Sequence, residues 1–216
     1  GTDILRVTEA ISKLDSDLIG VAEYEPSEPA ELYDLVADSY PYHVFYPGDT
    51  DVGLLSRYPI LSQQVIAPAD MRSAFIRVQV DVQGTPVMVY VVHLASPHIA
   101  LPFTYDDSAR DREVAFVLER LREETGPVLL LGDFNLSDQS DAYRSFDRLL
   151  ADAFRERGRG FGFTFPSQRR FVPPLIRIDY VWHSDHFVTR DAWLEQDSGT
   201  SDHRPVMAVV ALKQPA

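Results

Sequence analysis

The sequence has 216 residues, of which 45% are hydrophobic and 25% charged, a composition typical of a globular protein rather than a disordered or fibrous one. Its 20 basic and 33 acidic residues give a net charge of −13, which repels polyanions at long range and argues against tight, nonspecific binding to duplex nucleic acid. The sequence contains no cysteine, which excludes disulfides, thiolate metal sites and thiol nucleophiles. Its longest apolar run, VMAVVAL at 206–212, is too short for a membrane-spanning helix.

The first half of the chain is predicted to alternate helices with strands. Apolar residues at helical spacing predict a helix over 3–17, and the short apolar run that follows it, 18–23, has strand length. A second helix is expected over 28–41, followed by strands at 42–47 and 52–60. Alternating apolar residues from Ala74 to Val82, the turn sequence Gln83-Gly84-Thr85 and a mostly apolar return strand predict a β-hairpin over 73–94.

The second half continues the same alternation. An amphipathic helix is predicted over 106–126, then the apolar strand of PVLLLGDFN, then another helix over 140–154. The segment 157–174 is rich in Gly, Arg, Phe and Pro and is typical of a long exposed loop, and strands at 176–183 and 204–212 finish the chain on either side of 187–196. We find no linker or repeat, so we expect one domain over 1–216, a mixed α/β sandwich with sheets covered by helices.

Polar residues of the types that bind metals or phosphate stand at the ends of several predicted strands. They are Glu23, His93, Asp133, Asn135, Asp179, Asp202 and His203. Taken singly, each acid or amide at such a position is more often a turn former or a helix cap, and each histidine more often has a structural role. Asp179 differs because it interrupts an apolar alternation, and a buried carboxylate is costly unless it is paired or bound to a metal.

Taken together, these residues suit the binding of a divalent cation and the hydrolysis of a phosphoester. Carboxylates and an amide that converge at strand ends form an all-oxygen site for a hard divalent cation, Mg²⁺ or Mn²⁺. Two histidines beside such a site supply hydrogen-bond donors to a phosphoryl group. Hydrolysis of a phosphoester needs an activated water, a Lewis acid and donors for the developing charge, and the set contains a candidate for each role.

The ordered motifs AEYE, GLLSRYPI, VVHLASP, LLGDFN, IDYVW and SDHRPV resemble those of the endonuclease/exonuclease/phosphatase superfamily, which has the fold of deoxyribonuclease I. The resemblance covers the chain from about Ile4 to Leu212. It implies a four-layered α/β sandwich in which two mainly antiparallel or mixed sheets pack face to face between outer helices. It also implies a metal-dependent phosphoester hydrolase.

The resemblance assigns a role to each matching position. Glu23 and Asp202 would bind the metal, Asp133 would orient or deprotonate the attacking water, and Asn135 would hold the scissile phosphate. His203, paired with Asp179, would face the phosphate, and His93 would be a second donor to the phosphate or the leaving oxygen.

The chain departs from the family pattern at two places. The family's first strand carries an asparagine that helps to hold the metal, and this sequence begins downstream of that position, so the first strand is expected to be missing. We therefore expect an unpaired edge on a neighbouring strand, RPVMAVVAL at 204–212. The family's usual glutamine before the metal-binding glutamate is Ala22 here, which removes a nearby amide but no metal ligand.

The fold fixes the reaction type better than the substrate. We expect a phosphodiesterase or nuclease-like enzyme. The alternatives are a phosphatase or sphingomyelinase-like enzyme acting on lipid or sugar phosphates, and a noncatalytic domain that binds a phosphate ligand. Arg169, Arg170 and Arg177, in a segment that also carries several phenylalanines, resemble a cationic rim for a phosphate-bearing ligand, whether nucleic acid, phospholipid or small phosphoester, although a solvated loop explains them equally well.

Localisation and oligomeric state stay open at this stage. Arginine dominates the basic residues, since only Lys13 and Lys213 are lysines, and this bias is typical of a GC-rich, bacterial genome. Some bacterial members of the superfamily carry membrane-spanning segments ahead of the domain, so an extracytoplasmic or membrane-anchored location through an upstream segment is compatible with the sequence.

Overall fold

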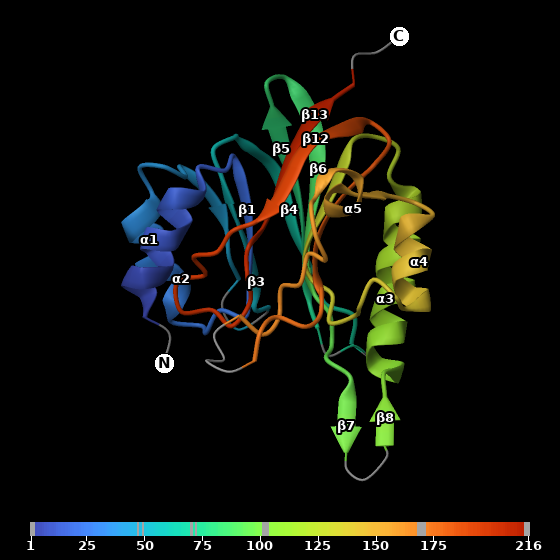
Figure 1. Cartoon of the computed structure of the whole chain (residues 1–216). Helices are drawn as coiled ribbons and strands as arrows, with labels where there is room; N and C mark the ends of the chain where they lie inside the picture. The colour runs from blue at the N-terminus through green and yellow to red at the C-terminus, as the bar shows by residue number, and fades with distance from the viewer. Residues whose placement is uncertain are drawn as a thin grey trace.

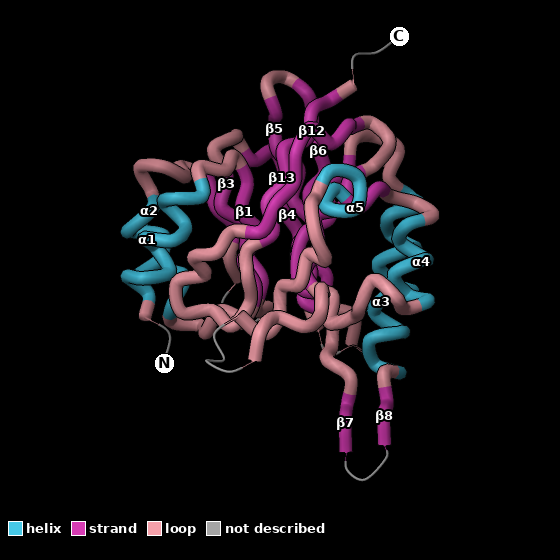
Figure 2. The backbone as a smooth tube through the Cα atoms, in the orientation of Figure 1, coloured by secondary structure: helices cyan, strands magenta, loops and turns pink. Residues whose placement is uncertain are grey.

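The computed structural model describes residues 3–46, 48, 50–69, 71, 73–100, 104–167 and 172–213. Helices α1 (Ile4–Leu14) and α2 (Glu28–Val36) lie on one side of the molecule, and α3 (Ser108–Glu123) and α4 (Asp141–Asp147) lie on the other. The strands fill the space between them (Figures 1 and 2). The predicted four-layered α/β sandwich is confirmed.

The first sheet has three antiparallel strands in the order β1-β3-β2, which are Leu18–Ala22, Val52–Ser56 and Tyr42–Val44. Helices α1 and α2 cover its outer face through a buried cluster that includes Ile11, Leu32 and Leu55. The N-terminal helix begins where Asp3 accepts a hydrogen bond from the backbone N–H of Arg6, as an N-cap should.

The second sheet has six strands in the order β10-β11-β9-β6-β5-β4. In that order the strands are Ala151–Asp152, Asp179–His183, Val128–Asp133, Thr85–His93, Phe75–Val82 and Ile60–Ile66. Strands β6 and β9 run parallel, and the other neighbours run antiparallel. The parallel pair brings the ends of two apolar strands to the same edge of the sheet.

Two apolar layers hold the sandwich together on either side of the second sheet. Between the sheets, fully buried Leu54, Ile76 and Val89 belong to one cluster of mainly aliphatic side chains. Between the second sheet and helices α3 and α4, Trp182 and Phe146 belong to a second cluster that is rich in aromatic rings. The strands of the second sheet are apolar on both faces because both faces are covered.

A separate antiparallel pair consists of β12 (Phe187–Leu194) and β13 (Val206–Leu212). Within the described residues β13 pairs only with β12, and β1 pairs only with β3, so each has an edge without a strand partner. The unpaired edge expected on 204–212 is confirmed for this part of the chain. A short hairpin, β7 (His98–Ala100) and β8 (Thr104–Asp106), projects beyond the sandwich (Figure 1).

Several segments differ between the prediction and the structure. The predicted helix over 140–154 is wrong: α4 ends at Asp147, and a new helix, α5 (Ala153–Arg157), begins where buried Asp152 accepts hydrogen bonds from the N–H groups of Phe154 and Arg155. The predicted strand over 52–60 divides between β3 and β4, which belong to different sheets. The segment 187–194 forms a strand that the sequence analysis did not predict.

Within the described residues, no helix combines the length and the apolar character that crossing a bilayer requires.

Candidate active site

Strand register places three of the predicted site residues in one row across the second sheet. His93, the last residue of β6, is level with Asp133, the last residue of β9. Asp179, the first residue of β11, is level with Asp133 on its other side. The parallel pairing of β6 and β9 and the antiparallel pairing of β11 therefore bring an imidazole and two carboxylates to neighbouring strand ends.

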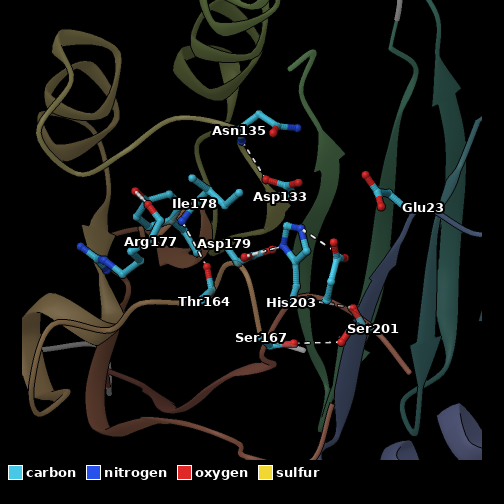
Figure 3. A network of polar contacts seen from close by, with 12 residues as sticks. Glu23, Asp133, Asn135, Thr164, Ser167, Arg177, Ile178, Asp179, Ser201 and His203 are labelled. Carbon is cyan, nitrogen blue, oxygen red and sulfur yellow. Dashed lines mark hydrogen bonds and ion pairs between the residues drawn. The ribbon is translucent and has the colours of Figure 1, made fainter. Parts of the chain in front are cut away.

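The first sheet supplies two carboxylates that face this row. Glu23 follows β1 and has a left-handed backbone, with φ 61°, and Asp51 precedes β3. The Nε2 atom of His93 lies 3.3 Å from Oε1 of Glu23, and its Nδ1 atom lies 2.7 Å from Oδ2 of Asp51. His93 therefore bridges the two sheets, and Figure 3 shows Glu23 on the side of the site opposite Asp133.

Asp133 and Asn135 form a rigid turn at the end of β9. Asp133 is buried, and its Oδ1 atom accepts a 2.7 Å hydrogen bond from the backbone N–H of Asn135 (Figure 3). Asn135 has φ 49°, a left-handed conformation that asparagine tolerates better than most residues. Its Nδ2 atom donates to the carbonyl of Leu94 at 2.8 Å, which ties the turn to the loop after His93.

His203 is oriented from three directions. Its Nδ1 atom lies 2.9 Å from Oδ2 of Asp179, and its backbone N–H donates to Oγ of Ser201 at 3.1 Å (Figure 3). The ring of Phe165 lies 4.9 Å from the imidazole, centroid to centroid. Because Asp179 contacts Nδ1, the Nε2 atom of His203 is the one left to face a ligand.

The electrostatics of the site follow from burial and from the crowding of carboxylates. Burial, and then the neighbouring Asp179, raise the pKa of Asp133 to about 7. Burial alone lowers the pKa of His203, but the hydrogen bond to Asp179 and the charges of Asp179, Asp133 and Asp202 outweigh it and raise that pKa to about 9. Burial also lowers the pKa of His93, yet the hydrogen bond to Asp51 reverses the direction of the shift. Both imidazoles are therefore stabilised as cations.

Two groups of side chains place possible metal-ligating atoms within 4.8 Å of one another. One group is Glu23, His93 and Asp133, and the other is Asp133, Asp179 and His203. Among the described residues neither group includes Asp202, whose side chain is 56% exposed and whose Oδ1 atom lies 4.0 Å from Nε2 of His203. Asp202 therefore lies at the margin of the site, and its role as a metal ligand stays a prediction.

The prediction that Arg177 belongs to an exposed, substrate-binding rim is wrong. Its side chain is 3% exposed, and its guanidinium pairs with Asp152 at 2.6 Å and with Asp138 at 3.3 Å. The guanidinium also lies 4.7 Å from the centroid of the Tyr180 ring. Arg177 therefore joins α5 to the aromatic core, because the buried carboxylate of Asp152 needs a cation. Arg169 and Arg170 lie outside the described residues.

Three residues with clear roles at the site were not predicted. Asp51 holds His93, and helix α3 supports the loops below the site through Arg110 and Glu113, which are 4% and 0% exposed. The Nη1 atom of Arg110 donates to the carbonyl of Asn135, and Glu113 accepts from the N–H groups of Ala95 and Ser73. The sequence signal that could have found two of them is an arginine and a glutamate three residues apart near the start of an amphipathic helix. Residues at this spacing share one face of the helix, and only one face is buried.

A sandwich of two sheets whose facing ends hold histidines paired with carboxylates agrees with the class of phosphoester hydrolases that the sequence motifs indicated. The family model described as Endonuclease/Exonuclease/phosphatase family matches residues 1–203, so the chain belongs to that family. Its members are phosphoester hydrolases. No curated protein shows significant sequence similarity to the chain.

Solved structures support the same fold. An endonuclease/exonuclease/phosphatase from Bacteroides vulgatus is 18% identical, with a TM-score of 0.78 over 97% of this chain and 90% of that one. The mannosyl-6-phosphatase Bt3783 of Bacteroides thetaiotaomicron is 17% identical, with a TM-score of 0.77 over 97% and 90%. D. rerio TDP2, complexed with a single-strand DNA product, is 18% identical, with a TM-score of 0.73 over 98% and 96%. At these identities the likeness shows the fold alone.

Proposed function

We propose that the chain is a divalent-metal-dependent phosphodiesterase of the nuclease-like type. The observation that carries the proposal is the pairing of two histidines with carboxylates on either side of Asp133: His93 with Asp51, and His203 with Asp179. Two cationic imidazoles that flank a buried carboxylate suit a reaction in which negative charge develops on a phosphoryl group between them.

The residues present fit a hard divalent cation. Glu23 presents a side chain that is 57% exposed. Asp133 is a buried carboxylate whose negative charge is destabilised by the like charge of Asp179, and a bound cation would relieve that repulsion. Oxygen-rich sites of this kind suit Mg²⁺ or Mn²⁺. Glu23, which groups with Asp133, would hold the ion, and the motif match adds Asp202 from the margin of the site. When bound, the ion supplies Lewis-acid stabilisation of the phosphoryl oxygens.

The other residues have roles that their hydrogen bonds support. Asp133 is held by the N–H of Asn135 and keeps its second oxygen for the attacking water, whose proton it accepts. The Nδ2 atom of Asn135 donates one hydrogen to Leu94, and its second hydrogen serves a phosphate oxygen. His203 donates from Nε2 to a nonbridging oxygen, while Asp179 fixes its orientation.

His93 is placed to protonate the leaving oxygen of a phosphoester. An alkoxide leaving group requires a proton, and the carboxylate of Asp51 raises the pKa of His93 and so favours its protonated form. His93 lies 3.8 Å from Asp133, measured from Nε2 to Oδ2, so the proposed acid and the proposed base are adjacent, one on β6 and one on β9.

The proposal is tested by steady-state hydrolysis of a panel that contains bis(4-nitrophenyl) phosphate, single-stranded DNA and RNA, a sugar monophosphate, sphingomyelin and an inositol phosphate. We expect turnover of the diesters with Mg²⁺ or Mn²⁺, and loss of turnover in a chelator that the metal restores. Preference for the sugar monophosphate or the lipid would replace the proposed substrate class with the phosphatase or sphingomyelinase alternative. No turnover of any substrate with either metal would contradict catalysis and favour a binding domain.

A further inference from the structure

A cavity of about 650 Å³ lies beside the candidate active site, within the size range of sites that bind small molecules. Its lining includes the aromatic residues Phe161, Phe163 and Trp193 and the basic residues Arg159 and Arg204. None of these residues belongs to the set that performs the proposed reaction. We propose that this cavity binds an unpaired nucleotide of the substrate by stacking its base on the aromatic rings and pairing its phosphate with the arginines, an inference that rests on the proposed function.

The aromatic wall offers flat, accessible ring faces. The rings of Phe161 and Phe163 are stacked, with centroids 5.1 Å apart and planes 9° apart, and Phe161 is 78% exposed. Gly162 between them is buried and has φ 69°, and a Cβ there would meet the Phe154 ring at 2.5 Å. Only glycine therefore lets the backbone pack this closely while both neighbouring side chains form a stacked pair. A platform of this kind suits a planar base, because every nucleobase has a π face.

The basic side chains of the cavity are available to a ligand. Within the part of the chain that the structure describes, neither Arg159 nor Arg204 forms an ion pair, whereas Arg177 in the same region has two. Asp191 also lines the cavity, and its Oδ1 atom accepts from the backbone N–H of Ala192. Two guanidinium groups without an ion-pair partner among the described residues, in a protein of net charge −13, mark a local site for an anion.

The cavity and the active site share two stretches of backbone. Phe163, which lines the cavity, is separated by one residue from Phe165, whose ring contacts His203. Arg204, which also lines the cavity, directly follows His203, and its backbone N–H donates to the carbonyl of Thr164 at 3.0 Å. The cavity and the imidazole that is proposed to face the scissile phosphate are therefore held by the same two stretches of chain.

The mixed character of the lining selects among phosphate-bearing ligands. An acyl chain would leave two guanidinium groups and Gln196 without partners, and the puckered ring of a sugar phosphate covers the flat phenylalanine rings less completely than a planar base does. A base joined to a phosphodiester satisfies both kinds of lining residue, because the base stacks on the aromatic rings and the phosphate pairs with the arginines. Since bases in a duplex are already stacked on each other, the cavity requires an unpaired nucleotide, which agrees with a net charge that disfavours duplex binding.

Tryptophan fluorescence tests the proposal directly, because the chain has two tryptophans in opposite environments. Trp193 lines the cavity and is 38% exposed, whereas Trp182 is fully buried in the core. The full chain is titrated in chelator, so that no substrate is cleaved, with pentathymidylate and with an abasic pentamer that carries the same phosphates. We expect pentathymidylate to quench the emission and to bind about 5- to 150-fold more tightly than the abasic pentamer, the range for one stacked base.

Matched variants identify the residues involved. Phe163→Leu keeps an apolar side chain without the flat ring and should abolish most of the preference for pentathymidylate, while Phe116→Leu on α3, outside the cavity, should preserve it. Arg159→Gln should weaken both pentamers, while Arg148→Gln at the exposed end of α4 should weaken neither. Trp193→Phe should remove the quenching. Thermal melts establish that each variant is folded.

Equal affinity for the two pentamers, quenching that survives Trp193→Phe, or quenching by phospholipid vesicles but not by pentathymidylate would overturn the proposal. These results are separable from failure of the proposed function. Hydrolysis of bis(4-nitrophenyl) phosphate without a base preference removes the nucleotide site and leaves the phosphodiesterase. A base preference without hydrolysis of any substrate removes the phosphodiesterase and leaves the nucleotide site.

Discussion

Glu113 on α3 should control both stability and activity, although it does not touch the substrate. Its side chain is fully buried, and its two carboxylate oxygens accept separate hydrogen bonds from the backbone N–H groups of Ser73, at 3.0 Å, and Ala95, at 2.6 Å. Ala95 lies two residues after His93, so this contact fixes the loop that leaves the active site. The change Glu113→Gln keeps the shape of the side chain and replaces one acceptor oxygen by a donor.

The size of the effect follows from these two hydrogen bonds. A hydrogen bond to a charged group contributes about 1.5–3 kcal/mol, and a buried donor left without a partner costs a similar amount. In Glu113→Gln one backbone N–H keeps an oxygen acceptor, and the other faces an amide NH₂ group. We therefore expect a fall of about 2–4 kcal/mol in the free energy of unfolding, and a fall on the order of 10 °C in melting temperature.

The assay is urea unfolding followed by circular dichroism, together with steady-state hydrolysis of bis(4-nitrophenyl) phosphate. The matched control is Glu119→Gln, an exposed position on the same helix, which should change the free energy of unfolding by less than about 0.5 kcal/mol. We expect Glu113→Gln also to lower kcat, because the loop after His93 loses an anchor. Equal stability of the two variants would refute the reasoning.

Three further changes test other contacts. Asp51→Asn should lower kcat about tenfold or more with little change in melting temperature, because His93 loses the carboxylate that keeps it charged; an unchanged kcat would contradict this. In the wild type the activity that depends on charged His203 should fall as pH rises through about 9, and Asp179→Asn should move that fall toward or below neutral pH, where pH–rate profiles reveal it. Arg177→Met should lower the free energy of unfolding by about 3 kcal/mol, because its buried aspartate partner loses its cation, with KM unchanged; a raised KM at unchanged stability would restore the substrate-binding role.

Elements with strong local patterns were predictable from the sequence. The hairpin of β5 and β6 follows from apolar alternation before a Gln-Gly-Thr turn and a mostly apolar return strand, and α3 follows from its apolar stripe. The convergence of Glu23, Asp133 and His203 was predictable only through the family resemblance, because spacing along the chain contains no information on which strands become neighbours.

The elements that escaped prediction have identifiable causes. The register of β12 shifts between Thr189 and Asp191, and this irregularity breaks the two-residue alternation by which a strand is recognised. Asp51 follows the sequence Pro-Gly-Asp-Thr, which is typical of a turn, and so resembles a turn residue. Its role depends instead on the pairing of β1 with β3 and on the position of His93 in the other sheet. Arg177 follows a Pro-rich segment that suggests exposure, and only the fold reveals the buried carboxylate beside it.

The central claim is that strand ends from both sheets form one phosphoester-hydrolysing site around Asp133. The most direct measurement is kcat for bis(4-nitrophenyl) phosphate in Asp133→Asn, with Asp185→Asn, a fully exposed position, as the control. We predict that Asp133→Asn retains its circular dichroism spectrum and loses about 10²- to 10⁴-fold in kcat, while Asp185→Asn matches the wild type. A folded Asp133→Asn protein that turns over at the wild-type rate would contradict the claim.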